Sequence, residues 1–189
     1  MATLIYSMNV SADGYVEDAD GSLAFSEPSE ELHRWWNRRT ELASALLYGR
    51  GLYETMEEFW TAPERADGSE VEAEFARAYV ATPRIVFSDS LESVAPGCRL
   101  VRSADAVAEV RRLKEEHDGS LDLAGPGLAS TLLDLIDEFQ VVMAPVAVGG
   151  GKPFFPLGAH VDLRLVEQHT FGSGAVQLRY ERVRAAERE

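Results

Sequence analysis

Residues 122–131 read Asp122-Leu123-Ala124-Gly125-Pro126-Gly127-Leu128-Ala129-Ser130-Thr131. An apolar run passes there into a glycine-rich turn and then into the spacing of an amphipathic helix. Backbone N–H groups at a helix N-terminus are unpaired and carry partial positive charge, and Gly125 and Gly127 lack the Cβ that would keep a diphosphate away. The stretch therefore predicts a strand, a turn that binds a nucleotide cofactor, and a helix. A turn with a purely steric role is the alternative.

Two further glycine-rich turns follow apolar runs. Gly49-Arg50-Gly51 comes after the run that ends at Tyr48 and opens a helical pattern. The Arg50 guanidinium suits a phosphate in a bidentate fork, and a solvated arginine is the alternative. Gly149-Gly150-Gly151-Lys152-Pro153 follows the apolar residues 144–148. Three consecutive glycines cost backbone entropy, so this loop indicates a close approach or unusual dihedral angles.

The pattern along the chain predicts an α/β fold. Apolar runs alternate with helical patterns, so most strands of the central sheet should be parallel, with helices on its flanks. The turn Gly172-Ser173-Gly174 instead joins two alternating runs and predicts a C-terminal antiparallel hairpin. We expect one domain over 1–183, a frayed tail over 184–189 and a surface connection over 63–70. The expected strands are 3–10, 44–48, 84–88, 98–102, 121–124, 139–147, 162–171 and 174–183, and the expected helices are 29–42, 51–60, 69–80, 104–117 and 127–136.

Composition excludes several classes of partner. The chain has 189 residues, 46% of them hydrophobic, and a formal charge of −14. Nucleic acid is an unsuitable partner for such a charge, because phosphates are held chiefly by Lys and Arg. The single Cys98 forms no internal disulfide, and no stretch reads as a signal peptide or a membrane span, so we expect a cytoplasmic protein. The four histidines show no metal-ligand spacing, so no metal is expected.

Taken in order, the motifs resemble the dihydrofolate reductase-like superfamily. The similarity is strongest to the branch that holds the reductase (C-terminal) domain of the bacterial riboflavin biosynthesis deaminase-reductase. The resemblance implies a single-domain dihydrofolate reductase-like fold and hydride transfer from NADPH to a small heterocyclic acceptor, pteridine- or pyrimidinedione-like, or to another small molecule. It rests on Ser11-Ala12-Asp13-Gly14, the Gly-Arg and Gly-Pro-Gly turns, the Gly-Gly-Gly-Lys-Pro loop and the closing hairpin.

The same resemblance implies the cofactor-binding residues. The glycine turn matches the family's diphosphate site, and Arg50 matches an arginine that meets the 2′-phosphate of the adenosine. Ser88 and Arg102 fall where the family contacts the adenosine end, and the backbones of Asn9 and Val16 match contacts to the nicotinamide carboxamide. The full expected set is Asn9, Val16, Gly49, Arg50, Gly51, Ser88, Arg102, Gly125, Pro126, Gly127 and Leu128.

Three positions depart from the family's pattern. Leu52 replaces a threonine, Leu128 replaces an arginine, and Asp89 stands where a serine or a basic residue is usual. An aspartate repels a 2′-phosphate and accepts hydrogen bonds from a ribose diol, which makes NADH possible. Arg50 and Arg102 favour NADPH. Because proline lowers the cost of a cis peptide, Gly125–Pro126 is expected to be cis, as the family's turn is.

Glu31 is the candidate catalytic group. Its carboxylate stands with Leu32 and Trp35 at the spacing that the folate enzymes use to bind a pterin, which implies a general acid or orienting carboxylate and two substrate-binding residues. The alternative is an ordinary acid in the first turn of a helix. Trp35 and Trp36 are not distinguished: one is expected to line a ring pocket and the other to face the core or a partner.

Two other functions remain open at this point. One is a true dihydrofolate reductase, and the other is a non-catalytic nucleotide-binding or scaffolding member of the fold. We also expect a homodimer, because one apolar surface of the predicted sheet is larger than its own helices would cover. That surface comprises Val141, Met143, 146–148 and 154–156.

Overall fold

The computed structural model describes residues 1–66 and 68–184 and contains one large and one small sheet. The strands are β1 (Thr3–Val10), β2 (Tyr15–Glu17), β3 (Ala43–Gly49), β4 (Arg84–Phe87), β5 (Cys98–Val101), β6 (Ser120–Ala124), β7 (Glu138–Met143), β8 (Lys152–Pro153), β9 (Leu163–Thr170) and β10 (Val176–Arg182). The large sheet has eight strands in the order β5-β4-β3-β6-β1-β7-β10-β9. Its neighbours pair in parallel from β5 through β7, and β10 runs antiparallel to both β7 and β9.

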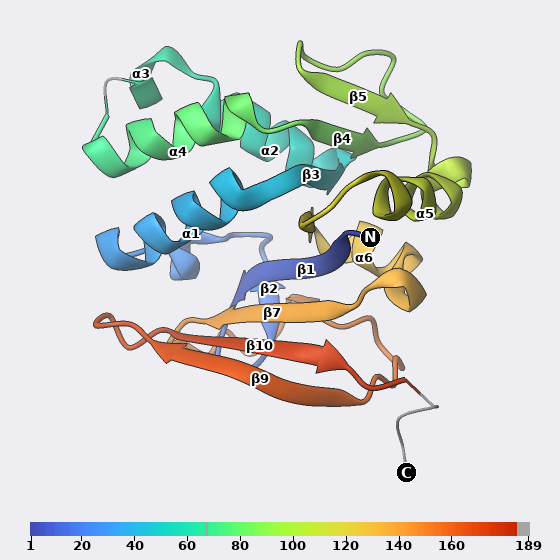
Figure 1. The fold of residues 1–189 in the computed structure, drawn as a ribbon. Coiled ribbons are helices and arrows are strands. Elements are labelled where there is room, and N and C mark those ends of the chain that lie inside the picture. The colour runs from blue at the N-terminus through green and yellow to red at the C-terminus, as the bar shows by residue number, and fades with distance from the viewer. Residues whose placement is uncertain (67, 185–189) are drawn as a thin grey trace.

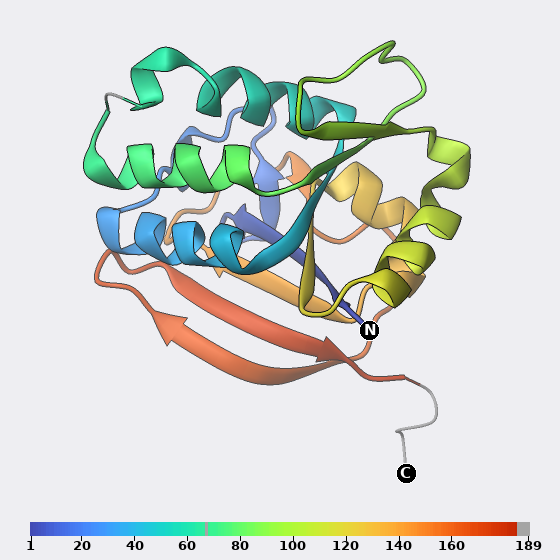
Figure 2. The ribbon, with the colours of Figure 1, turned by 45° about the horizontal axis from the view of Figure 1, so that its top comes forward.

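Helices cover both faces of this sheet, as Figure 1 shows. They are α1 (Glu30–Leu42), α2 (Arg50–Trp60), α3 (Pro63–Ala66), α4 (Glu70–Ala81), α5 (Ala106–Glu116) and α6 (Pro126–Thr131), with 3₁₀ turns η1 (Ala24–Ser26), η2 (Ser103–Asp105) and η3 (Leu133–Leu135). Helices α1 and α4 lie against one face, and α5 and α6 lie against the other (Figure 2). The predicted α/β fold, with a mostly parallel sheet and a C-terminal hairpin, is confirmed.

The core follows the alternation of the strands. Leu121 and Leu123 of β6 point toward α5 and pack with Val110 and Leu113. The residue between them, Asp122, is also buried. Successive side chains of a strand point to opposite faces, so this carboxylate lies on the α1 side of the sheet. That placement puts one buried acid beneath α1.

Two local expectations need correction, and one strand pairing was not expected. The helix expected over 127–136 ends at Thr131 and continues as the 3₁₀ turn η3, which tightens the chain so that Leu132 and Ile136 are both fully buried before β7 begins. The connection over 63–70 contains the short helix α3. Strands β2 and β8 pair through Tyr15 and Pro153, which no local pattern indicated. Of the predicted frayed tail, residues 185–189 lie outside the described residues.

The surface on which the homodimer was predicted is mostly covered within the chain. Phe154 is 3% exposed and stacks on Tyr6 at 4.2 Å between ring centroids. Val141 is buried, and Met143 packs on the same core. The uncovered patch is smaller than expected, because β2 and β8 bring the Gly-rich loop back onto the sheet, although Val146 and Ala147 remain exposed. The homodimer stays a prediction: light scattering at micromolar concentration should give twice the 20.8 kDa chain mass, and a monomer mass would contradict it.

Candidate active site

The two predicted turns meet at one cavity. Strands β3 and β6 are adjacent and parallel, so their carboxyl ends bring the turns before α2 and α6 to the same edge of the sheet. A cavity of about 650 Å³ opens there. Eight of the predicted cofactor residues line it, namely Val16, Gly49, Arg50, Gly51, Gly125, Pro126, Gly127 and Leu128. Its size is in the range that holds a small-molecule ligand.

Gly125 makes its turn with a positive φ of 96°, a conformation that residues with a Cβ rarely adopt. Pro126 then occupies the first position of α6, where its missing N–H costs nothing. No peptide bond in the described part of the chain is cis, so the expected cis Gly125–Pro126 bond is wrong. The positive φ at Gly125 redirects the chain without it.

Two cationic side chains line the same cavity. Arg50 is more than half exposed, and its Nη1 lies 3.4 Å from Glu54 Oε2 on the next helical turn. Lys152 Nζ lies 3.3 Å from Glu17 Oε1. Exposed pairs of this kind contribute little, so both cations are available to a phosphate. Sequence analysis did not include Lys152 among the candidate site residues. The glycine loop before it was a signal of a close approach of two backbone segments. A Cβ on Gly151 would lie 1.9 Å from Glu17 O, so only glycine fits at this position.

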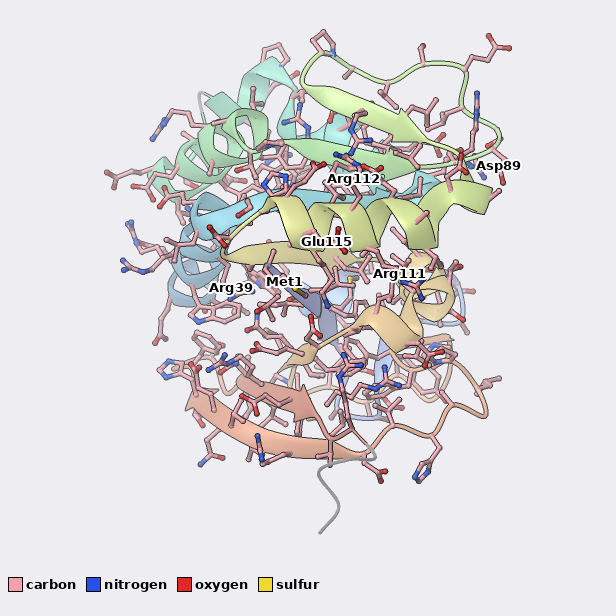
Figure 3. All side chains as sticks on the ribbon, turned by 45° about the vertical axis from the view of Figure 1, so that its right-hand side comes forward. Met1, Arg39, Asp89, Arg111, Arg112 and Glu115 are labelled. Carbon is pink, nitrogen blue, oxygen red and sulfur yellow. The ribbon has the colours of Figure 1, made fainter. Side chains whose placement is uncertain are left out.

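The residues expected at the adenosine end stabilise a loop instead of lining the cavity. Ser88 Oγ accepts the N–H groups of Ser90 and Leu91, and Arg102 Nη1 donates to the carbonyls of Ser88 and Leu91. Asp89 Oδ1 accepts the N–H of Ser103 at 2.9 Å, and this hydrogen bond lowers the pKa of Asp89. Figure 3 shows Asp89 near the start of α5, far from Arg39. These residues therefore fix Ser103, which does line the cavity.

A second cavity of about 600 Å³ lies between the sheet, α1, α2 and α4. Its walls are mainly apolar and include the aromatic rings of Trp36, Tyr48, Phe59, Trp60 and Phe75. The two cavities are adjacent and share a wall, because four residues line both of them, namely Met8, Leu23, Leu52 and Thr55. A cofactor in the first cavity and an acceptor in the second would meet along this shared wall.

Asn9 and Val16 lie at different cavities. Val16 is 1% exposed and lines the first cavity. Asn9 lines the second, where its Oδ1 accepts Trp36 Nε1–H at 3.1 Å. This bond holds the indole ring in the cavity wall.

The predicted substrate residues lie on the wrong side of α1. Glu31 Oε2 accepts the N–H of Gly172 at 2.9 Å, Leu32 packs in a cluster with Phe171, and the Trp35 ring meets Phe171 edge-on. None of the three lines either cavity. The catalytic role predicted for Glu31 therefore finds no support in its position.

The face of α1 that does line the second cavity carries His33, Trp36 and Thr40. Their spacing of three and four residues is that of one helix face. This spacing was the signal that sequence analysis missed, because the pterin-like spacing from Glu31 was followed instead.

Glu31→Gln is accordingly expected to leave turnover and its pH–rate profile unchanged, because the amide oxygen still accepts the Gly172 N–H and the group is remote from both cavities. Stability should change by less than about 1 kcal/mol. Steady-state rates across pH, with Glu30→Gln as the matched control, test this. Loss of an ionisation seen in the parent would restore Glu31 as the catalytic acid.

Two absences concern the described residues only. No helix among residues 1–66 and 68–184 has the length and apolar character needed to cross a membrane. Within the same residues, no group of three or more His, Cys, Asp or Glu side chains is placed to hold a metal ion.

The order of strands, the helices on both faces and the cavity at the carboxyl edge define a dihydrofolate reductase-like α/β protein. The chain belongs to the RibD C-terminal domain family, whose model matches residues 2–177.

Known proteins match over nearly the whole chain. An uncharacterized Bacillus subtilis protein, YyaP, is 26% identical over 183 residues, which are 94% of this chain and 93% of that protein. Dihydrofolate reductase from Enterococcus faecalis, solved with NADP(H), has a TM-score of 0.66 at 14% identity, covering 95% of this chain and 96% of that one. The Thermotoga maritima diaminohydroxyphosphoribosylaminopyrimidine deaminase/5-amino-6-(5-phosphoribosylamino)uracil reductase also has a TM-score of 0.66 at 17% identity, covering 96% of this chain and 57% of that one. At these identities the two structures are evidence of a shared fold.

Proposed function

We propose that the protein is an NADPH-dependent reductase that transfers a hydride to a small heterocyclic acceptor. The observation that carries this proposal is the pair of adjacent cavities, one lined by two glycine turns and two cations, the other by apolar side chains that include five aromatic rings. Family membership supports it, since one solved relative of this fold is a reductase of a phosphoribosylaminouracil and another binds NADP(H). The bound cofactor would supply the hydride.

Residues of the chain would bind the cofactor, exclude water and support the acceptor. The glycine turns leave room for a diphosphate, Lys152 offers it positive charge, and Arg50 offers positive charge to a 2′-phosphate. Met8 and Leu52, on the wall shared by the cavities, exclude water from the space between cofactor and acceptor. Trp36, held by Asn9, supports the acceptor ring. A proton must reach the reduced acceptor from a group in the second cavity or from water.

We propose that the protein binds NADPH more tightly than NADH, because the charged side chains near the first cavity favour a 2′-phosphate. The exposed Arg50 guanidinium, held only by a surface pair with Glu54, offers charge to a 2′-phosphate, whereas the Asp89 carboxylate already accepts the Ser103 N–H. A cytoplasmic location fits the proposal, because the cytoplasm keeps thiols reduced and the chain's single Cys98 is free.

Arg50→Ala should weaken NADPH binding about ten- to a hundredfold and NADH binding less than about threefold, since a hydrogen bond to a charged group contributes about 1.5–3 kcal/mol. Fluorescence titration of the two cofactors checks it, with Arg111→Ala on the exposed side of α5 as the control. Equal loss of both cofactors would mean that the guanidinium meets the diphosphate or is structural.

The test of the proposed function is NADPH consumption with defined acceptors. Dihydrofolate, a ribosylaminopyrimidinedione and flavin-like rings should be offered separately, and absorbance at the nicotinamide wavelength followed. Turnover of at least one acceptor, abolished when the second cavity is blocked by Leu46→Trp at its floor, is expected. NADPH binding without turnover of any acceptor would favour the non-catalytic member of the fold.

A further inference from the structure

The second cavity has an unusual balance of charge, and the inference drawn from it rests on the proposed function, because that function makes this cavity the acceptor site. Among the described residues that line it there is no Lys and no Arg, whereas two acids, Glu27 and Asp122, do line it. The neighbouring cofactor cavity has the cations Arg50 and Lys152. Of the described residues that line the two cavities, the cations therefore belong to the first one, and the guanidinium of Arg65 lies behind the Phe59 ring of the second.

Asp122 is the deeper of the two acids. It is 8% exposed, and both of its carboxylate oxygens lie within 3.4 Å of Arg39 Nη2 on α1. Burial raises the pKa of the Asp122 carboxyl, while the guanidinium opposes this shift. Arg39 does not itself line the cavity, so a ligand there meets the carboxylate and not its counter-ion.

His33 adds a second hydrogen-bond acceptor to the wall. Its Nδ1 lies 2.9 Å from Asn37 Oδ1, and Asn37 Nδ2 donates to Val71 O at 2.9 Å. That donation fixes Oδ1 of the amide as an acceptor, so His33 Nδ1 carries the hydrogen. In the neutral ring Nε2 then presents a lone pair, and no described residue bonds it.

The remaining polar groups of the wall are uncharged and include the hydroxyls of Ser7, Thr40 and Tyr48. The Asn9 amide oxygen is occupied by Trp36, and the Ser7 hydroxyl accepts from Gln140 Nε2 at 3.4 Å. The described wall of the cavity therefore offers aromatic faces, hydroxyls and two carboxylates, and it lacks the cations that bind phosphate or carboxylate.

We propose that this cavity binds a planar acceptor that carries no phosphate or carboxylate, is neutral or cationic, and presents N–H donors to Asp122 and His33. A phosphoribosyl substituent, such as the substrate named for the Thermotoga maritima reductase carries, would enter without a counter-ion and beside two acids. The protein accordingly acts on an unphosphorylated ring.

Riboflavin and flavin mononucleotide test the proposal, because they share one planar ring with an N–H edge and differ by a phosphate. Binding to the full chain, without NADPH, is measured by flavin fluorescence polarisation at pH 7.5. Riboflavin should bind at least tenfold more tightly than the mononucleotide. Equal affinity for the two flavins, tighter binding of the mononucleotide, or no binding of either flavin at a protein concentration of 1 mM would overturn the proposal.

Variants identify the groups responsible. Asp122→Asn leaves Arg39 without its anion, so affinity for the mononucleotide should rise and the ratio of the two affinities should fall toward one. Glu27→Gln, at an exposed position, should lower the same ratio by a smaller factor and serves if the buried variant unfolds. Glu115→Gln, on the exposed side of α5 (Figure 3), should leave the ratio unchanged. An unchanged ratio in both cavity variants would contradict the assignment to these acids.

The failure of this inference is distinguishable from that of the reductase proposal. The riboflavin measurement needs no cofactor, whereas the reductase proposal depends on NADPH binding and consumption. A protein that consumes NADPH yet binds both flavins equally would keep its function and lose the inferred substrate class.

Discussion

Gly127→Asp is expected to lower NADPH affinity at least a hundredfold while changing the melting temperature by no more than about 2 °C. A Cβ at this position would meet nothing within 4 Å, so the side chain enters open space in the cofactor cavity. Two unit charges about 4 Å apart near a protein surface repel by about 4 kcal/mol, and a hundredfold loss needs only about 2.7 kcal/mol. The variant therefore loses its ligand without losing its fold.

The control is Gly150→Asp in the loop before β8. A Cβ there also meets nothing within 4 Å, and the residue is not among those that line the cavity. It should retain parental NADPH affinity. Gly127→Ala separates charge from volume, and it should cost much less than the aspartate. Parental affinity in Gly127→Asp would place the diphosphate elsewhere.

The second large effect concerns stability. Arg84→Met is expected to lower the free energy of unfolding by about 3–5 kcal/mol, as does breaking a buried ion pair by removing one partner. Arg84 is 2% exposed, its Nε lies 3.4 Å from Glu57 Oε2, and its guanidinium also donates to the carbonyls of Tyr79 and Pro96. Methionine would leave the Glu57 carboxylate without its cation and two carbonyls without donors.

Urea unfolding followed by circular dichroism measures this loss, which corresponds to a fall of roughly 10 °C in melting temperature for a chain of this size. Arg111→Met on the exposed side of α5 should change stability by less than about 0.5 kcal/mol. Adding Glu57→Gln to Arg84→Met should recover part of the loss, because the unpaired charge is removed. If Arg84→Met lowered the free energy of unfolding by less than about 1 kcal/mol, the Arg84–Glu57 pair would contribute little to stability.

The fold could be predicted because its signals are local. Strand β6 and the turn into α6 were predicted from ten consecutive residues, and the C-terminal hairpin from Gly172-Ser173-Gly174. The pairing of β2 with β8 could not, because Tyr15 and Pro153 are far apart in sequence and each strand is too short for a periodic pattern. The end of α6 was missed because the same leucines fit either an α-helix or a 3₁₀ turn.

The candidate site, like the fold, was predictable only in part. The glycine turns and Arg50 line the predicted cavity because each motif lies at a strand end, which parallel pairing brings to one edge. The acceptor cavity was not predictable from the chosen residues, since Glu31 and His33 differ by two positions yet lie on different faces of α1. Asp122 was interpreted only as part of a strand. Its contact with Arg39 could not be predicted, because the two residues are 83 positions apart in the sequence.

Titration of NADPH into the purified chain tests the central claim most directly. The nicotinamide emission, excited through tryptophan, should change and saturate at micromolar concentration, because Trp36 and Trp60 line the cavity adjacent to the proposed cofactor site. Gly127→Asp, titrated in parallel, should show no saturation over the same range. An emission that changes only in proportion to added NADPH, up to 1 mM and alike in both proteins, would contradict the account.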